Sequence, residues 1–400
     1  MASDPNIPGE KRPAPDYSEP APPTSRPLQI FLLVAFLITA AAYVTDQWTA
    51  QRIQEMQVKR PNPLKRLVES QSAYLAHIKA GDDALARKQY DKAVSEYRLA
   101  LQGQDQSEGH QKLGQALLKQ NNPDAAFAEF REAVKINPRQ IEAYGIWGQA
   151  LVSQGKAGDA VSLYLGALQT NANAGVLHFN LAAALQDEQR NAEAVRRLSA
   201  AKGKTNEAAA AAAESQRLAT EALEQYTQAG RLGVKSAAFW SSFGVLLNEQ
   251  GKFADAEACL TRAINEDPSL SRAHSELALA QFRQGNYGDA IEHYNKVLTL
   301  IPDDPATLDS LAQIYATATN SEVLSPKMAV QLAQRACDAN ASQNARFMDT
   351  LARSYAADGD FLKAMSWEEK ALRRAGQLGD RSLESDLQAR YTLFLNHKTQ

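Results

Sequence analysis

The sequence has little of what marks an enzyme or a nucleic-acid binder. Its 43 basic and 46 acidic residues leave a formal charge of −3, whereas a general nucleic-acid binder normally has a strongly basic domain. Phosphate-loop, dinucleotide-binding, HExxH and GxSxG motifs are missing, as is any Cys/His zinc spacing. The two cysteines, Cys259 and Cys337, fall in helical patterns and predict small buried side chains rather than a disulfide framework. We therefore predict no enzyme, cofactor, metal or nucleic-acid partner.

Proline is concentrated in residues 1–27, which contain eight of the 16 prolines. Apolar side chains are too sparse there to bury a core, so we predict a disordered or locally polyproline II tail. Residues 46–73 are charged, helical in pattern and without a repeat. We predict that they form a helical stalk or linker, broken near Pro61 and Pro63.

Between these segments, residues 27–45 contain no charged side chain. A helix of this length is on the order of 28 Å long, close to the thickness of a bilayer hydrocarbon core. We predict a transmembrane helix over residues 28–45. A cleavable signal peptide is the main alternative, because the apolar run 28–38 precedes three consecutive alanines, and a buried core helix is a third. The long, proline-rich segment before the run favours the anchor.

The charges that flank this span give only a weak indication of its orientation. The positive-inside rule leans slightly towards a cytoplasmic C-terminal side. An uncleaved anchor with a short tail inside and a large domain outside is nevertheless a common arrangement. We therefore favour an extracytoplasmic location for the large domain that follows the span. The basic residues before the span are Lys11, Arg12 and Arg26, and those after it are Arg52, Lys59, Arg60, Lys65 and Arg66.

From residue 74 the chain repeats with a period of 34 residues. Within each unit an alanine is followed by a large apolar residue four positions later and by a small one after three more, as in Ala126, Phe130 and Ala133. These residues share one helix face. A small residue on the facing helix lets the backbones approach and leaves a hole that the large side chain fills. Two series of such small residues are Gly114, Gly148, Ala182 and Gly244, Ala278, Ala312.

Residues 144–168 and 240–268 resemble the tetratricopeptide repeat along their whole length, with Trp240, Phe243, Gly244, Leu247, Gly251, Ala256, Ala263 and Pro268 in register. The resemblance implies an all-α fold, a right-handed superhelical solenoid of about nine antiparallel helix pairs over residues 74–378. The units would begin near residues 74, 107, 141, 175, 203, 237, 271, 305 and 345, and a capping helix would follow over residues 379–400.

Two units depart from the repeat pattern. The fourth is short, and the first helix of the fifth has almost only alanine to pack with, so we predict a weak or bent joint near residue 203. The eighth has extra residues and predicts a longer turn after Tyr315. Elsewhere the polar cluster in residues 285–302 is interpreted as the surface of a helix, because Ala290 and Tyr294 form the packing face of the same segment.

Four histidines, His77, His110, His178 and His274, occupy the same place in their units, where Tyr144 and Trp240 stand in others. The coincidence raises the possibility of a metal site or a pH switch. Equivalent side chains in stacked repeats are generally too far apart to share one metal ion. We therefore favour a packing role for these histidines.

By analogy with the family, the first helices of the units line a concave groove for an extended peptide or a partner helix. The places of the lysine and asparagine clamp that some family members use for a terminal carboxylate hold Gln111, Gln115 and Ile146, so we do not expect that ligand. The candidate partner-binding residues are Gln111, Gln115, Lys119, Gln149, Asn180, Asn248, Arg272 and Arg353.

Three functions remain open from the sequence. The first is a single-pass membrane scaffold or holdase that recruits partner proteins, similar to the membrane-anchored tetratricopeptide proteins of bacterial inner membranes. The second is a cytoplasm-facing receptor or regulatory subunit that brings a cytosolic protein to the membrane. The third, an enzyme with an unrecognised site, has no motif to support it. Fold alone does not decide between them.

Overall fold

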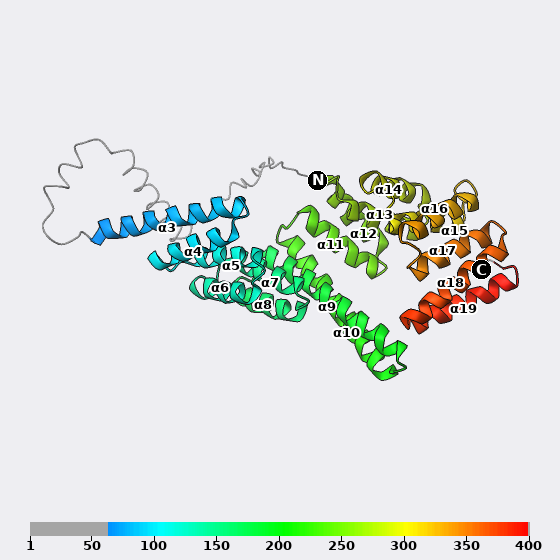
Figure 1. Ribbon diagram of the computed structural model, residues 1–400, viewed down its shortest axis with the longest axis horizontal. Helices are drawn as coiled ribbons and strands as arrows, with labels where there is room; N and C mark the ends of the chain where they lie inside the picture. Colours follow the sequence, from blue (N-terminus) through cyan, green and yellow to red (C-terminus); the bar gives the residue numbers. More distant parts are fainter. Residues whose placement is uncertain (1–62, 399–400) are drawn as a thin grey trace, which may run out of the picture. The chain divides into compact units, whose positions relative to one another are not determined.

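The computed structural model describes residues 63–398, and this part of the chain contains 17 helices and no strand. The described residues fall into two units, with the boundary between His77 and Ile78 inside the first helix; Figure 1 labels the helices. The predicted all-α class is confirmed for the described residues. The helices are α3 (Pro63–Ala86), α4 (Tyr90–Gly103), α5 (Ser107–Lys119), α6 (Pro123–Ile136), α7 (Ile141–Ser153), α8 (Ala157–Thr170), α9 (Gly175–Ala201), α10 (Thr205–Arg231), α11 (Ala237–Glu249), α12 (Phe253–Glu266), α13 (Ser271–Arg283), α14 (Tyr287–Leu300), α15 (Pro305–Thr317), α16 (Pro326–Ala339), α17 (Ala345–Ala357), α18 (Phe361–Leu378) and α19 (Arg381–Leu395).

Consecutive helices pair through a small residue on one helix and a large one on the next. A side chain added to Gly114 of α5 would lie 2.8 Å from Phe130 Cε1 of α6, and one added to Gly148 of α7 would overlap the ring of Tyr164 on α8. Phe130 and Tyr164 are both fully buried. The role predicted for the small residues is therefore confirmed in these pairs, because the ring fills the space that a missing side chain leaves.

The turn inside each regular hairpin places one residue in the left-handed region of φ. Gly155, Gly251 and Gly285 take this place with φ of +73°, +70° and +82°. Lys88 and Asn121 take it in the α3–α4 and α5–α6 turns, with φ of +59° and +60°. A residue with a Cβ is strained there, by roughly 1–2 kcal/mol, and asparagine tolerates the strain better than lysine does.

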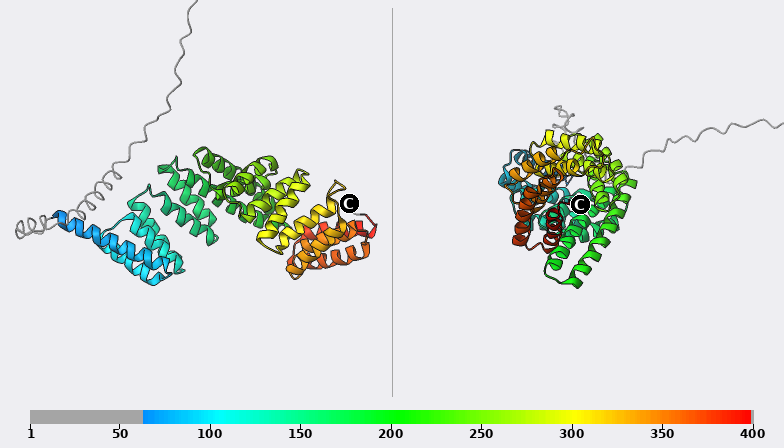
Figure 2. Two further views of the ribbon diagram at one scale, coloured as in Figure 1. Left: turned by 90° about the horizontal axis from the view of Figure 1, so that it is seen from above. Right: turned by 90° about the vertical axis from the view of Figure 1, so that its right-hand side faces the viewer.

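The fourth and fifth predicted units are in fact one long hairpin. Helices α9 and α10 have 27 residues each, and the hairpin extends further than its neighbours in Figure 1 and in the right-hand view of Figure 2. Ala194, where the period places a packing residue, is exposed, and Ala222, 28 residues later, is fully buried instead. Each of these two helices is about four turns longer than a helix of a regular unit, and a whole number of extra turns leaves the packing faces of the hairpin aligned. The sequence therefore looks like a short repeat unit followed by a second unit.

The region of the eighth predicted unit has a longer turn, as the sequence predicts. Residues 318–325 connect α15 to α16, and the backbone N–H of Ser325 donates to the carbonyl oxygen of Tyr315 at 2.9 Å. This bond returns the chain to the end of α15 before α16 begins.

The last helix, α19, packs on the final pair. Its Phe394 is fully buried in a small apolar cluster with Ala352, Ala356 and Ala364 of α17 and α18. Leu387 of α19 joins the larger core, which runs from Ala278 of α13 through α18. An aromatic side chain therefore covers the apolar surface that the last pair would otherwise expose.

Three predictions lie outside the described residues. They are the tail over residues 1–27, the transmembrane helix over 28–45 and the stalk from 46 to 62. The end of the predicted stalk is helical, since α3 begins at Pro63. Between residues 63 and 398, no helix combines the length and the apolar character that crossing a membrane requires.

Candidate functional site

Three of the eight predicted groove residues are buried and make contacts inside the protein. Gln111 accepts a hydrogen bond from Gln140 Nε2. Asn248 Nδ2 donates to the carbonyl oxygen of Glu276 at 2.9 Å, which joins α11 to α13. Asn180 Nδ2 lies beside Gly145 of α7, 3.2 Å from where its Cβ would be. The amides of Gln111 and Asn248 join neighbouring repeats, and all three side chains are buried, so we leave the three residues out of the candidate surface.

The other five predicted residues reach the surface to different degrees. Lys119, Gln149 and Arg272 are exposed, whereas Gln115 and Arg353 are half-buried. The positive charge of Arg353 acts on the buried carboxyls of Asp309 and Asp349, where it opposes the rise in their pKa caused by burial. The exposed residues Lys119, Gln149 and Arg272 are therefore the best candidates for contact with a partner.

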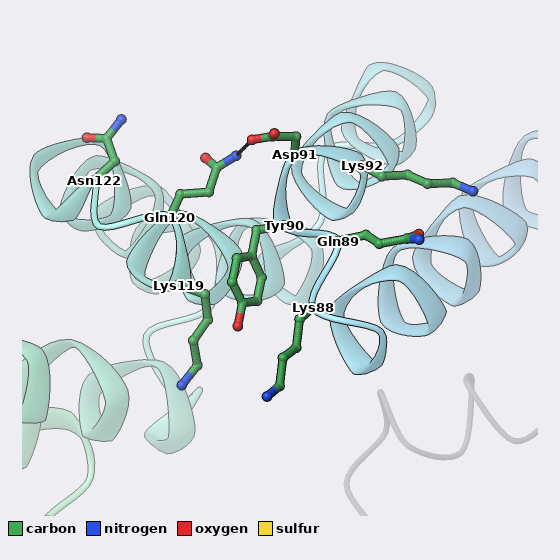
Figure 3. Close-up of a pocket in the computed structure, with 8 residues that line it drawn as sticks. All are labelled: Lys88, Gln89, Tyr90, Asp91, Lys92, Lys119, Gln120 and Asn122. Atoms are coloured by element: carbon green, nitrogen blue, oxygen red, sulfur yellow. Dashed lines mark hydrogen bonds between the residues drawn. The ribbon is translucent and has the colours of Figure 1, made fainter.

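Lys119 lines the pocket shown in Figure 3, which has a volume of about 770 Å³. The pocket lies at the α3–α4 and α5–α6 turns, the two hairpin turns in which Lys88 and Asn121 take the place of glycine. In the close-up, the side-chain ends of Lys88, Tyr90 and Lys119 point to the same side. The other lining residues are Gln89, Asp91, Lys92, Gln120 and Asn122.

A neighbouring pocket continues along the next turn. It has a volume of about 440 Å³ and includes Gln149 together with Ile146 of α7 and Leu118 of α5. Its lining is less charged than that of the first pocket, since it contains no lysine, arginine or carboxylate. The first three hairpins thus have two adjacent pockets, one with three lysines in its lining and one with uncharged side chains only. Sequence reasoning found one residue of each, Lys119 and Gln149, but missed the turn residues because it looked only at first helices.

Three of the four repeated histidines, His110, His178 and His274, make hydrogen-bonding contacts through both ring nitrogens. His178 places Nε2 3.0 Å from the carbonyl oxygen of Ala172 and Nδ1 2.7 Å from Gln225 Oε1. His274 likewise places Nε2 3.1 Å from the carbonyl oxygen of Pro268, and its Nδ1 lies 3.0 Å from His293 Nδ1. Each ring therefore ties the loop before a hairpin to the second helix of that hairpin.

His110 makes the same kind of bridge to two carboxylates. Its Nδ1 lies 2.6 Å from Glu129 Oε2 and its Nε2 2.7 Å from Asp105 Oδ1. The hydrogen bond to Glu129 raises the pKa of His110 above its usual value, and Asp105 adds to the effect. The protonated ring can donate to both carboxylates at once, so this bridge is strongest below that pKa.

The main cluster of buried carboxyls lies at the other end of the chain. Asp309 and Asp349 are 7% exposed and Glu368 is 0% exposed. Burial raises the pKa of Asp309 to about 6, and burial together with the charge of Asp349 raises the pKa of Glu368 to about 8. Arg390 of α19 lies 2.7 Å from Asp349 Oδ1 and 3.7 Å from Glu368 Oε1.

In this cluster, Arg390 pairs α19 with Asp349 of α17 and Glu368 of α18. Within residues 63–398 no group of three or more His, Cys, Asp or Glu side chains is placed to hold a metal ion. Glu368 stands between Ala364 and Ala371 of α18, the place that Phe130 takes between Ala126 and Ala133 of α6. The cluster thus fills an aromatic position with a carboxyl and uses Arg390 as its partner.

Both cysteines are free, as predicted. Cys337 is buried in the core of α15–α18 and Cys259 is partly buried. Burial raises the pKa of the Cys337 thiol to about 12 and that of Cys259 to about 11. Neither thiol is therefore an activated nucleophile at neutral pH, because the thiolate is the reactive form.

Comparison with solved structures finds chains that resemble parts of this one. A chain titled "Functional Characterization of Pseudomonas Aeruginosa pilF" is 16% identical with a TM-score of 0.48, and it covers 61% of this chain and 99% of its own. YrrB, described as a tetratricopeptide protein with an unusual peptide-binding site, is 16% identical with a TM-score of 0.40, covering 53% and 92%. A thermophilic tetratricopeptide protein of Thermus thermophilus is 21% identical with a TM-score of 0.37, covering 50% and 94%.

Sequence comparison assigns the repeat itself. The tetratricopeptide repeat pattern matches residues 107–140 and residues 242–305. These segments contain the hairpins α5–α6 and α13–α14, and the hairpin α11–α12 except for the first five residues of α11. A comparison with curated protein sequences gives no match. Two segments of the chain therefore match the tetratricopeptide repeat, and they lie within an all-helical array of hairpins. Proteins with this repeat generally mediate protein–protein interactions.

Proposed function

We propose that this protein is a single-pass membrane protein whose solenoid recruits partner proteins, as a scaffold or holdase in complex assembly or in the handling of envelope proteins. The observation that carries the proposal is the stack of helix hairpins with tetratricopeptide repeats, which leaves Lys119, Gln149 and Arg272 exposed on first helices. Such a stack supplies an extended polar surface, and extended surfaces of this kind bind peptides or helices.

The membrane part of the proposal is supported by the uncharged run over residues 27–45. Its length suits a bilayer core, and the proline-rich segment before it is unlike the start of a cleaved signal peptide. We place the protein in a bacterial inner membrane with its solenoid on the extracytoplasmic side. In this arrangement the anchor keeps the binding surface close to proteins that are exported or assembled at the membrane.

Site-specific crosslinking in intact cells tests the binding surface. A photoreactive residue is placed at Gln149 of α7 or Arg272 of α13, and at the exposed controls Lys135 of α6 and Thr299 of α14, which are second helices. We expect the first-helix positions to capture the same one or few partners, and the controls to capture much less. Equal capture at all four positions, or no capture, contradicts the proposal.

A cytoplasm-facing receptor is a second candidate, because more basic residues follow the apolar run than precede it. External protease added to spheroplasts separates the two orientations. Digestion of the solenoid supports the extracytoplasmic scaffold, whereas protection supports the receptor. Partners captured by crosslinking give an independent answer, since their compartment must match that of the solenoid.

A further inference from the structure

The α3–α4 and α5–α6 turns place Lys88 and Asn121, rather than glycine, in the left-handed position, and these two turns form the basic pocket of Figure 3. In the regular hairpins that follow, glycine takes the left-handed position, as Gly155 and Gly251 do. Lysine at this position costs stability that glycine would not. Other residues with a side chain also have positive φ, among them Asp303 and Ala341, so the strain points to a function of Lys88 only together with its place at a pocket. Unlike glycine, Lys88 places a charged side chain at the mouth of the pocket.

Three polar groups converge at this mouth. Figure 3 shows the ammonium groups of Lys88 and Lys119 on either side of the hydroxyl of Tyr90, with all three ends on the same side of the two turns. The pocket's carboxylate, Asp91, faces elsewhere and accepts a hydrogen bond from Gln120 Nε2 at 2.6 Å. The three groups thus offer donors to a negative group, and Asp91 is already engaged.

We propose that this pocket binds an acidic segment of a partner protein. Its ammonium and phenol groups suit carboxylate side chains, and the amide of Gln89, which also lines the pocket, suits the polar groups of a peptide backbone. A volume of about 770 Å³ is in the range of sites that hold a small ligand or several residues. The proposal rests on the proposed function, because it names the chemistry of a partner segment.

The test uses the full-length protein in detergent and a fluorescent peptide rich in glutamate, with the same peptide carrying glutamine in place of glutamate as the reference. We expect the glutamate peptide to bind more tightly, and Lys88→Gln or Lys119→Gln to weaken it about fivefold each. Lys92→Gln is the matched control, because Lys92 lines the same pocket but points away from the other two lysines in Figure 3.

The Lys92→Gln control distinguishes binding at Lys88 and Lys119 from attraction of the peptide by the overall positive charge of the pocket. If Lys92→Gln weakens binding as much as the other two substitutions, the peptide responds only to overall charge and the proposal fails. It also fails if the two peptides bind equally. The remaining alternative is a lipid headgroup, and binding to vesicles of anionic lipid is compared with binding to vesicles of neutral lipid. Binding to the vesicles that depends on Lys88 and Lys119, without binding to the peptide, would assign the pocket to a lipid headgroup and overturn the proposal.

Lys88→Gly separates binding from folding. Glycine relieves the backbone strain at a φ of +59°, so we expect this variant to unfold at a higher temperature and yet bind the glutamate peptide about fivefold more weakly. Asn121→Gly relieves the same kind of strain at +60° without removing a charge, and should bind normally. A parallel loss of binding in both glycine variants would show that turn conformation, and not the lysine charge, is responsible.

The outcome is independent of the crosslinking test. If Gln149 and Arg272 capture partners but the peptide does not bind, only the acidic-segment proposal fails. If the peptide binds through Lys88 and Lys119 but no first-helix position captures a partner in cells, the proposed recruiting function fails while the pocket remains.

Discussion

The α5–α6 pair and the α17–α18 pair fill the same position in different ways. In the first, Phe130 is fully buried against Gly114, and no polar group is needed. In the second, Glu368 takes the corresponding place with 0% exposure, and Arg390 comes from the following helix to face it. The aromatic pair is complete by itself, whereas the polar pair depends on α19. A repeat position therefore fixes where a side chain packs but not what holds it there.

The largest effect is expected where an aromatic ring alone fills the position. Phe130→Ala leaves a cavity opposite Gly114, and we expect a loss of about 3–5 kcal/mol in the free energy of unfolding of the α5–α6 region. Urea unfolding followed by hydrogen exchange in α5 and α6 measures it. A loss below about 1 kcal/mol would mean that the neighbouring helices close the cavity.

A smaller effect is expected at the polar pair. Arg390→Met removes the cation paired with Asp349 and Glu368, while the charge of Arg353 remains. We expect a loss of about 2 kcal/mol, because the side chain of Arg390 is 30% exposed. Arg373→Met is the matched control, since Arg373 is 67% exposed and its pair with Glu369 at 3.8 Å should contribute less than about 0.5 kcal/mol. Similar losses in both variants would remove any special role for Arg390.

The polar pair should also respond to pH, unlike the aromatic one. The folded protein raises the pKa of Glu368 to about 8, so between the unfolded value and 8 the folded state holds a proton that the unfolded state has released. Stability should therefore fall as pH rises from about 5 to 8, by roughly 1–2 kcal/mol. Glu368→Gln should lose most of this slope, and unfolding curves at the two pH values test it. An unchanged slope would place the titration elsewhere, for instance at Asp309.

The smallest effect concerns the turns. Gly251→Ala places a Cβ at a φ of +70°, and we expect a loss of about 1 kcal/mol in the free energy of unfolding. Gly103→Ala is the reference, because Gly103 lies in α4 with no atom near its missing Cβ, and should gain a few tenths to about 1 kcal/mol. Thermal unfolding of both variants measures the difference. Equal shifts would show that the left-handed turn is not the determining factor.

Two features escaped sequence reasoning for the same reason. Extra turns in α9 and α10 keep the faces of both helices aligned, so a period of 34 residues fits a short unit where none exists. The basic pocket joins side chains from two turns that are far apart in sequence, Lys88 with Tyr90 and Lys119 with Gln120. A repeat pattern shows which positions of successive units are equivalent. It does not show which side chains of adjacent units are in contact.

The sequence by itself determined the helical class, the spacing of most hairpins and the small-against-large packing, because these depend on residues close together along the chain. Gly114 and Phe130 are 16 positions apart and can be read from one unit. The tertiary structure decided which polar residues are available. Gln111, Asn180 and Asn248 were predicted to face a partner, yet they are buried between repeats. Burial depends on how one hairpin stacks on the next, and that is set by the packing of several units together.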